Sequence, residues 1–428
     1  MGVKFMIQIL KNSIDLLASR FVNVLAQLGI VVLVSRRLGP DVFGEFAFLN
    51  AVVMTGIVAA NFGLDTYMVR DISRDDSRGN GLIWAIFKFK TVSSVIVIGA
   101  IFVLFRYVLD TRSISNLLTL LSVTICLNSL SQSLWFYGDA FNRFRIHAFL
   151  WGGANLFRLG FIWLLLSYRN NLVMVVYAII LAEMVNLVIS YATVKAKFNI
   201  KPVPIPLHEL ATLLKKSYPM ALIFILSVLY FRIDLIMLKL ATTAKAVGYY
   251  AASLRIVEFI GIIPGTIYMA AFPVLSKDYV HDQQAFYAGA RKSLLMLGPI
   301  ALFMALFVYF LSPGIIGILY GPAFSASAEI LRIMTGVIFL IFFSGYFAYF
   351  HMAMGNEKLV AAILIVATLF KTLSNYFLIP GYGPVGSAFA ALFSESVIVV
   401  LYIIPLLLWV RSQKHPAPPV EVVADERS

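Results

Sequence analysis

Charged residues are scarce in this sequence. Asp, Glu, Lys and Arg make up 13% of its 428 residues, whereas hydrophobic residues make up 61%. A soluble domain carries roughly 25% charged residues. Water therefore cannot be the main solvent of the chain, and the composition predicts an integral membrane protein.

Cysteine and catalytic motifs are equally scarce. The single cysteine, Cys126, lies within an apolar stretch, so no intrachain disulfide can form. The five histidines are scattered without metal-ligand spacing, and no glycine-rich phosphate loop ending in Lys-Ser or Lys-Thr occurs. No soluble stretch is long enough for a nucleotide-binding domain. We therefore expect no metal, no cofactor, no ATP hydrolysis and no enzymatic activity.

Long apolar runs alternate with short polar joints along the chain, and each run approaches the roughly 20 residues that a spanning helix needs. We predict an all-α, polytopic membrane protein of about twelve transmembrane helices. Polar residues interrupt the first run and no cleavage site follows it, so we expect it to remain as a span. The predicted spans are 13–35, 41–62, 81–105, 114–138, 146–168, 172–194, 217–238, 248–272, 293–312, 328–352, 359–379 and 385–410.

Basic residues predict the orientation in the membrane. The chain has 34 Lys and Arg residues, and with both termini inside, most of those between spans fall on cytoplasmic joints. This distribution satisfies the positive-inside rule. We therefore expect a multi-pass protein of the cell inner (cytoplasmic) membrane with both termini in the cytoplasm. The net charge of +13 does not indicate a nucleic-acid partner, because the basic residues are dispersed over these joints.

Two similar segments lie about half the chain apart. The sequence FGEFA at 43–47 opens the second predicted span and VGYYA at 247–251 opens the eighth, with the exits ISRD at 72–75 and LSKD at 275–278. Such a repeat predicts two six-helix lobes of the same orientation with a substrate site between them; chance similarity of apolar segments is the alternative. The predicted division is an N-terminal lobe over 1–200, a C-terminal lobe over 201–412 and a disordered cytoplasmic tail over 413–428.

Polar residues inside the spans predict a cavity. A charge at the bilayer centre costs roughly 2.5 to 3.5 kcal/mol, so such residues should face the bundle interior or a wet cavity. The cations within the spans, Arg20, Arg158, Arg232, Arg255, Arg332 and Lys371, outnumber the four acids there, and arginine suits phosphate oxygens. The candidate cations are Arg20, Arg158, Arg255 and Lys371, the candidate neutral residues are Asn23, Gln27, Asn128, Gln132, Asn155 and Asn375, and the acids are Asp234, Glu258, Glu183 and Glu395.

A structural role is the alternative for each charged residue taken singly. Arg255 and Glu258 are three residues apart on one predicted helix, where such a pair can neutralise itself. Lys90, near the start of the third span, is predicted to extend its ammonium to the membrane surface. Tryptophans and tyrosines near span ends, such as Trp135, are predicted to form interfacial belts.

Short runs with glycine, proline and charged residues occur in a fixed order along the chain. They are RRLGPDVFGEFA at 36–47, NFGLD at 61–65, VRDISR at 69–74, VGYYAA at 247–252, FPVLS at 272–276, LYGPAF at 319–324 and IPGYGPVGSA at 379–388. In this order they resemble polysaccharide-biosynthesis flippases of the Wzx type, which belong to the multidrug/oligosaccharidyl-lipid/polysaccharide exporter superfamily.

The resemblance implies two six-helix lobes in a V shape around a central cationic cavity. It also implies translocation of an undecaprenyl-diphosphate-linked oligosaccharide to the outer leaflet for O-antigen or capsule, by alternating access coupled to an ion gradient. Arg20, Arg158, Arg255 and Lys371 would bind the diphosphate, and the four acids would be candidates for coupling to protons or sodium. The expected partners are the lipid-linked oligosaccharide, membrane lipids and a glycan polymerase, and the expected state is a monomer.

Two other functions compete with this interpretation. A cation-coupled multidrug exporter of the same superfamily should have an acidic cavity, so the sign of the buried charge separates the two. A membrane-embedded assembly partner of glycan polymerases would tolerate removal of the cavity charges.

Overall fold

The computed structural model describes residues 2–108, 112–201, 203 and 207–414. Within them every regular element is a helix. The longer helices are α1 (Gly2–Asn61), α2 (Leu64–Ile72), α3 (Gly79–Val103), α4 (Arg112–Ala140), α5 (Phe144–Tyr168), α6 (Leu172–Phe198), α7 (Leu207–Ala241), α8 (Ala244–His281), α9 (Gln283–Tyr320), α10 (Ser327–Ala353) and α11 (Glu357–Lys414).

The number of membrane crossings agrees with the prediction. Ten helical segments in the described residues are long and apolar enough to cross a membrane. Two of these, Val22–Ile72 and Glu357–Pro405, have 51 and 49 residues, more than twice the roughly 20 that one crossing needs. Each contains a non-helical glycine, Gly39 or Gly383, so each holds two crossings and the total is twelve.

A Gly-Pro pair makes both of these joints. Gly39 has φ 75° and Gly383 has φ 55°, a region that favours glycine because it lacks a Cβ atom. Pro40 and Pro384 follow directly, and proline suits the first turn of a helix because its missing N–H needs no partner there. The chain thus reverses at each joint with almost no intervening loop.

The helices extend beyond the predicted spans. α8 runs to His281 and α9 begins at Gln283, whereas the predicted spans stop at 272 and resume at 293. Hydropathy marks only the apolar part of a helix, and these extensions contain basic residues that suit water or lipid headgroups. The sequence also did not predict α2, which begins after a left-handed turn at Gly63.

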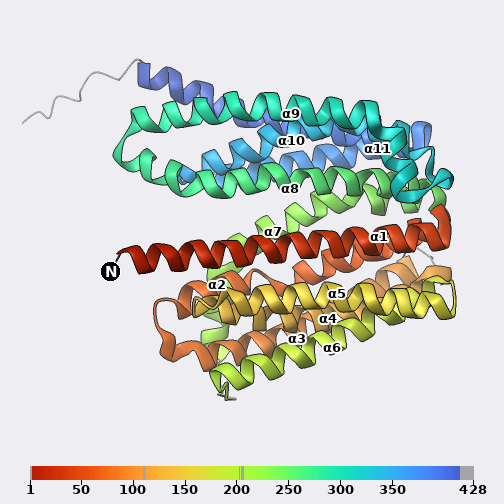
Figure 1. Ribbon diagram of the computed structural model, residues 1–428, viewed down its shortest axis with the longest axis horizontal. Coiled ribbons are helices and arrows are strands. Elements are labelled where there is room, and N and C mark those ends of the chain that lie inside the picture. The colour runs from red at the N-terminus through yellow and green to blue at the C-terminus, as the bar shows by residue number, and fades with distance from the viewer. Residues whose placement is uncertain (1, 109–111, 202, 204–206, 415–428) are drawn as a thin grey trace, which may run out of the picture.

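The helices form two groups. Helices α1–α6 pack mainly on one another, and so do α7–α11; we call these the N-terminal bundle and the C-terminal bundle. α1 lies between them, packing on α4 and α5 of its own bundle and on α7 and α8 of the other (Figure 1). Of the predicted tail, residues 415–428 lie outside the part of the chain that the structure describes.

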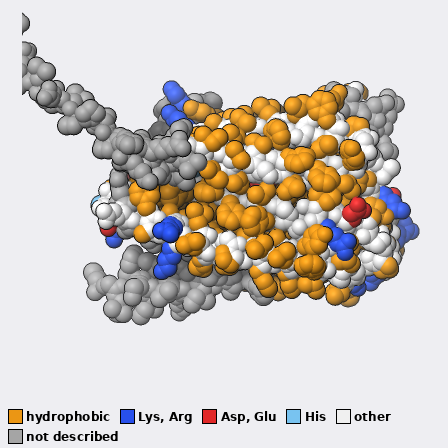
Figure 2. Space-filling view, turned by 90° about the horizontal axis from the view of Figure 1, so that it is seen from above, with side chains coloured by type: hydrophobic (Ala, Val, Ile, Leu, Met, Phe, Trp, Pro, Cys, Tyr) orange, Lys and Arg blue, Asp and Glu red, His pale blue; other side chains and the backbone are white. Residues whose placement is uncertain are grey.

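Apolar side chains cover the middle of the surface. Figure 2 shows them as a broad band on one face, with Lys and Arg side chains concentrated towards both ends. The exposed large hydrophobic side chains include Phe303, Phe310 and Leu369. This distribution matches a lipid-facing belt between two aqueous boundaries.

The two bundles are in backbone contact at a pair of repeat-related glycines. A Cβ atom on Gly44 would lie 1.8 Å from the carbonyl oxygen of Ala244, and one on Gly248 would lie 2.0 Å from that of Pro40. Pro40 precedes Gly44 by four residues, as Ala244 precedes Gly248, so the two contacts are equivalent under the repeat. Backbone therefore touches backbone, which only glycine permits at these two positions.

Side chains reinforce this end of the molecule. The Nε atom of Arg36 on α1 donates to the carbonyl oxygen of Leu319 at 2.9 Å, and its guanidinium also donates to Ile318. Both carbonyls lie in the last turn of α9, where a cation complements the helix dipole. Phe43 packs edge-on against Phe324, with ring centroids 5.8 Å apart. The bundles are thus joined at the end that holds the α7–α8 and α9–α10 joints.

Candidate functional site

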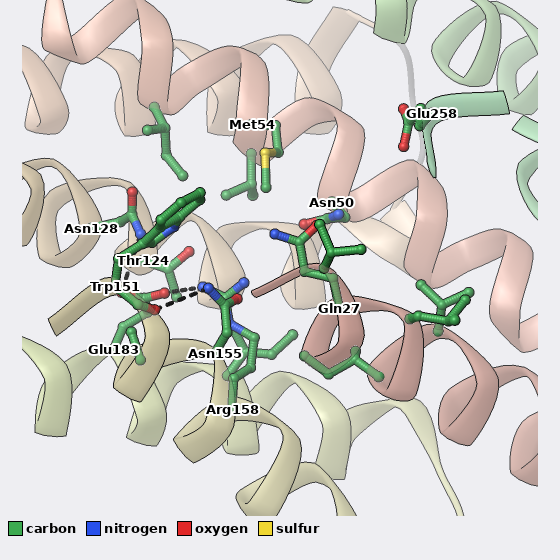
Figure 3. A pocket seen from close by; sticks show the side chains of 18 of the residues that line it. Gln27, Asn50, Met54, Thr124, Asn128, Trp151, Asn155, Arg158, Glu183 and Glu258 are labelled. Atoms are coloured by element: carbon green, nitrogen blue, oxygen red, sulfur yellow. Dashed lines mark hydrogen bonds and ion pairs between the residues drawn. The ribbon is translucent and has the colours of Figure 1, made fainter. Parts of the chain in front are cut away.

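A cavity of about 330 Å³ lies between α1, α4, α5 and α6 of the N-terminal bundle and α8 of the C-terminal bundle. Figure 3 shows Arg158 and Glu183 on one wall and Glu258 on another, with Gln27 and Asn50 between them in this view. Its polar and charged lining residues are Gln27, Asn50, Thr124, Asn128, Gln132, Asn155, Arg158, Glu183, Arg255 and Glu258.

Arg158 and Glu183 form an ion pair on the N-terminal wall. The guanidinium of Arg158 donates to one carboxylate oxygen of Glu183, and Asn128 Nδ2 donates to the other at 3.2 Å. The Glu183 side chain is only 2% exposed. The Nε atom of Arg158 is buried and has no hydrogen-bond partner among the described residues. Arg158 therefore keeps one free donor.

Glu258 holds two arginines on the C-terminal wall. Its Oε2 atom lies 2.8 Å from Arg255 on the same helix, and its Oε1 atom lies 2.5 Å from Arg232 on α7. The predicted pairing of Arg255 with Glu258 thus exists, but it is shared with a second cation. Three charges lie together, two positive and one negative.

Side-chain amides connect this polar network across α1, α4 and α6. Asn61 donates to Gln132 at 2.9 Å, Gln132 donates to Asn128 at 2.7 Å, and Asn128 in turn donates to Glu183. Asn155 donates to Asn23 at 2.5 Å. Asn23 is buried behind the cavity wall, whereas Gln27, Asn128, Gln132 and Asn155 line the cavity as their spacing suggests.

The charge of the cavity is more balanced than the sequence suggested. The described lining residues include two arginines, Arg158 and Arg255, and two glutamates, Glu183 and Glu258. Arg232 adds a third cation through its contact with Glu258. The side chain of Arg20 lies outside the described part of the chain. The described charges are thus three cations and two acids, an excess of one positive charge, and each of the three cations contacts an acid.

Lys371 does not line the cavity. It is 4% exposed within the C-terminal bundle, and its Nζ atom lies 2.7 Å from Asp234 on α7. Asn375 and Tyr250 donate to the two oxygens of Asp234, at 2.7 and 2.6 Å. Asp234 and Asn375 are fully buried in the same cluster. Three of the predicted site residues thus meet, away from the cavity.

Glu395 lies beside this cluster and is 5% exposed. The hydroxyl of Tyr230 donates to it at 2.6 Å, and that of Ser344 donates to its other oxygen. The Nζ atom of Lys371 lies 4.4 Å from the centre of the Tyr230 ring. The repeat relates Lys371 to Arg158 and Glu395 to Glu183, but only the N-terminal pair forms a direct salt bridge on the cavity wall.

Sequence reasoning missed several residues. Asn50 and Trp151 line the cavity, but Asn50 has no polar residue three or four positions away along its helix and Trp151 lies near a span end. The prediction for Lys90 was wrong, because its Nζ atom is fully buried and lies 2.7 Å from both carboxylate oxygens of Asp65. Asp65 lies in α2, the helix that the hydropathy pattern did not show. Within the described residues no group of three or more His, Cys, Asp or Glu side chains is placed to hold a metal ion.

Comparison with known protein families places this architecture in context. Residues 9–278, more than half of the chain, match the family described as polysaccharide biosynthesis protein. Residues 219–377 match the MatE family. A comparison with curated protein sequences finds no match.

Solved structures with the same fold are membrane transporters. A lipid II flippase MurJ in an inward closed conformation superposes with a TM-score of 0.76 at 14% identity, covering 93% of this chain and 87% of that one. An inward-facing multidrug resistance MATE transporter of the MOP superfamily has a TM-score of 0.72 at 15% identity, covering 92% and 96%. A MOP superfamily transporter from Pyrococcus furiosus, described by the reverse polarity of its binding pocket, has a TM-score of 0.64 at 14% identity, covering 95% and 96%.

Proposed function

Because this chain belongs to the family of polysaccharide biosynthesis proteins, we propose that it is a flippase for an undecaprenyl-diphosphate-linked oligosaccharide. It carries the lipid-linked repeat unit from the cytoplasmic to the outer leaflet of the inner membrane for a surface polysaccharide such as O-antigen or capsule. It makes or breaks no covalent bond. The observation that carries the proposal is that arginines from both bundles, Arg158 and Arg255, line one cavity.

The donors in the cavity suit a diphosphate attached to a sugar. A guanidinium presents a planar fork of N–H groups that matches phosphate oxygens, and Arg158 keeps a buried Nε–H without a partner. The amides of Gln27, Asn50 and Asn155 offer hydrogen bonds to sugar hydroxyls. The apolar residues between them can cover the polyprenyl tail or the faces of the sugar rings.

Movement of the two bundles relative to each other would give alternating access to the cavity. We propose that the lobes 1–200 and 201–412 rock about the cavity, with the closed contact at Gly44 and Gly248 opening when the substrate leaves. Arg20 remains a proposed diphosphate ligand by its place on α1. Lys371 lies away from the cavity, and its ion pair with Asp234 favours a structural role in the C-terminal bundle. Glu183 and Glu258 in the cavity, and Asp234 and Glu395 inside the C-terminal bundle, remain the candidates for ion coupling.

A multidrug exporter of the same fold is the second candidate. It would attract cationic drugs with an acidic cavity, whereas the described charges here are three arginines and two glutamates. The charge balance therefore favours an anionic substrate. The monomeric state and a glycan polymerase partner belong to the proposal as well.

Complementation tests the proposed function. A bacterial strain that lacks its own oligosaccharide flippase would express the wild type, Arg158→Ala or Arg255→Ala at matched membrane levels. A hydrogen bond to a charged group contributes about 1.5–3 kcal/mol, so each variant should lose at least about tenfold in surface glycan. Lipid-linked repeat units should accumulate inside. Arg332→Ala, which removes an exposed arginine outside the cavity, is the matched control and should retain function.

Two outcomes would contradict the flippase proposal. Full surface glycan with both cavity variants would favour an assembly partner, which needs no cavity charge. Loss of cationic-drug resistance in Glu183→Gln and Glu258→Gln variants, with glycan unaffected, would favour the multidrug exporter.

A further inference from the structure

The cavity arginines are already occupied by carboxylates. Arg158 is bound to Glu183, and Arg255 and Arg232 are bound to Glu258. A carboxylate and a phosphate use the same guanidinium N–H donors in the same geometry. An anionic ligand that uses these paired donors must share them with the glutamates or take them from the glutamates, whereas the Nε–H of Arg158 has no partner among the described residues.

The glutamates cannot move far from the arginines that they hold. Glu183 is 2% exposed and also accepts hydrogen bonds from Asn128 at 3.2 Å and Asn186 at 3.4 Å. Glu258 follows Arg255 by three residues on the same helix, so helix geometry keeps the pair adjacent. A bound phosphate would thus lie beside a carboxylate on either wall, and like charges at close range repel.

On both walls of the cavity a glutamate forms an ion pair with arginine, although different helices supply the residues. The N-terminal wall pairs α5 with α6, and the C-terminal wall pairs α7 with α8. In the C-terminal bundle the repeat partner of Glu183, Glu395, lies outside the cavity with Tyr230 and Ser344. The acid on the C-terminal wall is therefore supplied independently of the repeat, by Glu258.

We propose that Glu183 and Glu258 are internal competitors of the substrate: their carboxylate oxygens compete with its phosphate oxygens for the arginine N–H donors. This inference rests on the proposed function, and it assigns to the two glutamates the control of how tightly the cavity binds the diphosphate. While the cavity is empty, the glutamates keep the arginines neutralised and correctly oriented. When a diphosphate binds, it displaces them only in part, and their return to the arginines drives release into the outer leaflet. They are positioning residues, since they act on the substrate through the arginines.

Binding and transport should then change in opposite directions when an acid is neutralised. Purified full-length protein in detergent would be titrated with undecaprenyl diphosphate as the probe, and with undecaprenol as the control that has the same tail without phosphate. Glu258→Gln and Glu183→Gln should bind the diphosphate at least about tenfold more tightly than the wild type, because a repulsive neighbour is removed. Surface glycan in the complemented strain should fall, since release slows.

Glu357→Gln, a change at an exposed acid outside the cavity, should leave both readouts unchanged. Gel filtration and thermal unfolding would establish that the variants fold. Weaker or unchanged diphosphate affinity in folded Gln variants would overturn the inference while leaving the flippase intact, because a merely structural acid cannot raise affinity when it is lost. A wild type that does not distinguish undecaprenyl diphosphate from undecaprenol would overturn both this inference and the proposed diphosphate site.

Discussion

Lys90 and Asp65 form a buried ion pair inside the N-terminal bundle. Lys90 Nζ lies 2.7 Å from both oxygens of Asp65 and donates to the carbonyl oxygen of Ser129 at 3.1 Å, and Ser133 donates to Asp65 at 2.9 Å. Removing one partner of such a pair leaves an uncompensated buried charge. We expect Lys90→Met to lower the free energy of unfolding by about 3–5 kcal/mol.

Thermal unfolding of the purified protein in detergent measures this effect. The double variant Lys90→Met with Asp65→Leu should recover much of the lost stability, since both charges are gone and apolar packing replaces them. Exposed Lys88→Met is the matched single-residue control on the same helix. A Lys90→Met protein that melts with the wild type would contradict the buried pair.

The sequence could predict that the charged residues within the spans lie inside the protein. It could not predict which of them line the cavity and which form structural ion pairs. Arg158 and Lys371 occupy equivalent positions under the repeat, yet Arg158 faces the cavity and Lys371 faces Asp234. The difference depends on an acid on α7, more than a hundred residues away in sequence. Likewise, Lys90 looked interfacial because its partner Asp65 lies on the unpredicted α2. Contacts distant in sequence decide these roles, and periodicity carries no information about them.

At the scale of the elements, Gly44 of α1 and Gly248 of α8 bring the two bundles into backbone contact, and we expect this contact to close one end of the cavity. A Cβ atom at either position would lie within 2.0 Å of a backbone carbonyl oxygen of the other bundle. Backbone cannot give way as a flexible side chain can. We therefore expect Gly44→Ala or Gly248→Ala to separate the bundles at this end and to shift the population towards a state that is open there.

Cysteine labelling detects that shift. In a Cys126→Ser background, Asn50→Cys places a thiol in the cavity, and a membrane-impermeant maleimide is added to intact cells. Labelling should be low with native glycines and severalfold higher with Gly44→Ala. Gly160→Ala, at a position where a Cβ atom meets nothing within 4 Å, is the control and should label as the parent. Equal labelling of all three proteins would mean that this contact does not close the cavity.

The elements themselves were largely predictable from the sequence. Apolar length located every crossing, and the Gly-Pro pairs at 39–40 and 383–384 mark the two joints that the continuous helices α1 and α11 conceal. Helix ends were less predictable, because the helices continue into polar segments where hydropathy falls but backbone hydrogen bonding does not. The sequence did not predict α2, because a segment of nine residues that contains both acidic and basic side chains looks like a polar joint between two spans.

At the scale of the whole molecule, the two bundles are asymmetric around their cavity. The N-terminal bundle lines most of it with amides and the Arg158–Glu183 pair, whereas among the described lining residues those from the C-terminal bundle all belong to α8. The C-terminal bundle's buried ion pair between Lys371 and Asp234 joins α11 to α7 instead. One bundle is thus organised around the cavity and the other around its own interior, which the near-equal repeat in the sequence did not suggest.

The orientation of the protein in the membrane decides which side the end with the Gly44–Gly248 contact faces. The last turn of α6 carries Lys195 and Lys197 and the joint after it carries Lys201, whereas the joint between α5 and α6 carries only Arg169. The positive-inside rule therefore places the end of α6 in the cytoplasm. In a Cys126→Ser background, Asn170→Cys should react with an impermeant maleimide in intact cells. Lys197→Cys should react only after the cells are permeabilised. Both positions are exposed, so access to the reagent and not burial determines the result.

With twelve crossings, the α5–α6 joint lies on the same side as the joints at Gly39 and between α7 and α8. Labelling of Asn170→Cys from outside would therefore also place the Gly44–Gly248 contact at the outer surface, and the cavity would receive its substrate from the cytoplasmic leaflet. The reverse pattern would put the closed end inside. The described state would then be open to the outer leaflet, the state from which an alternating-access exporter releases its substrate.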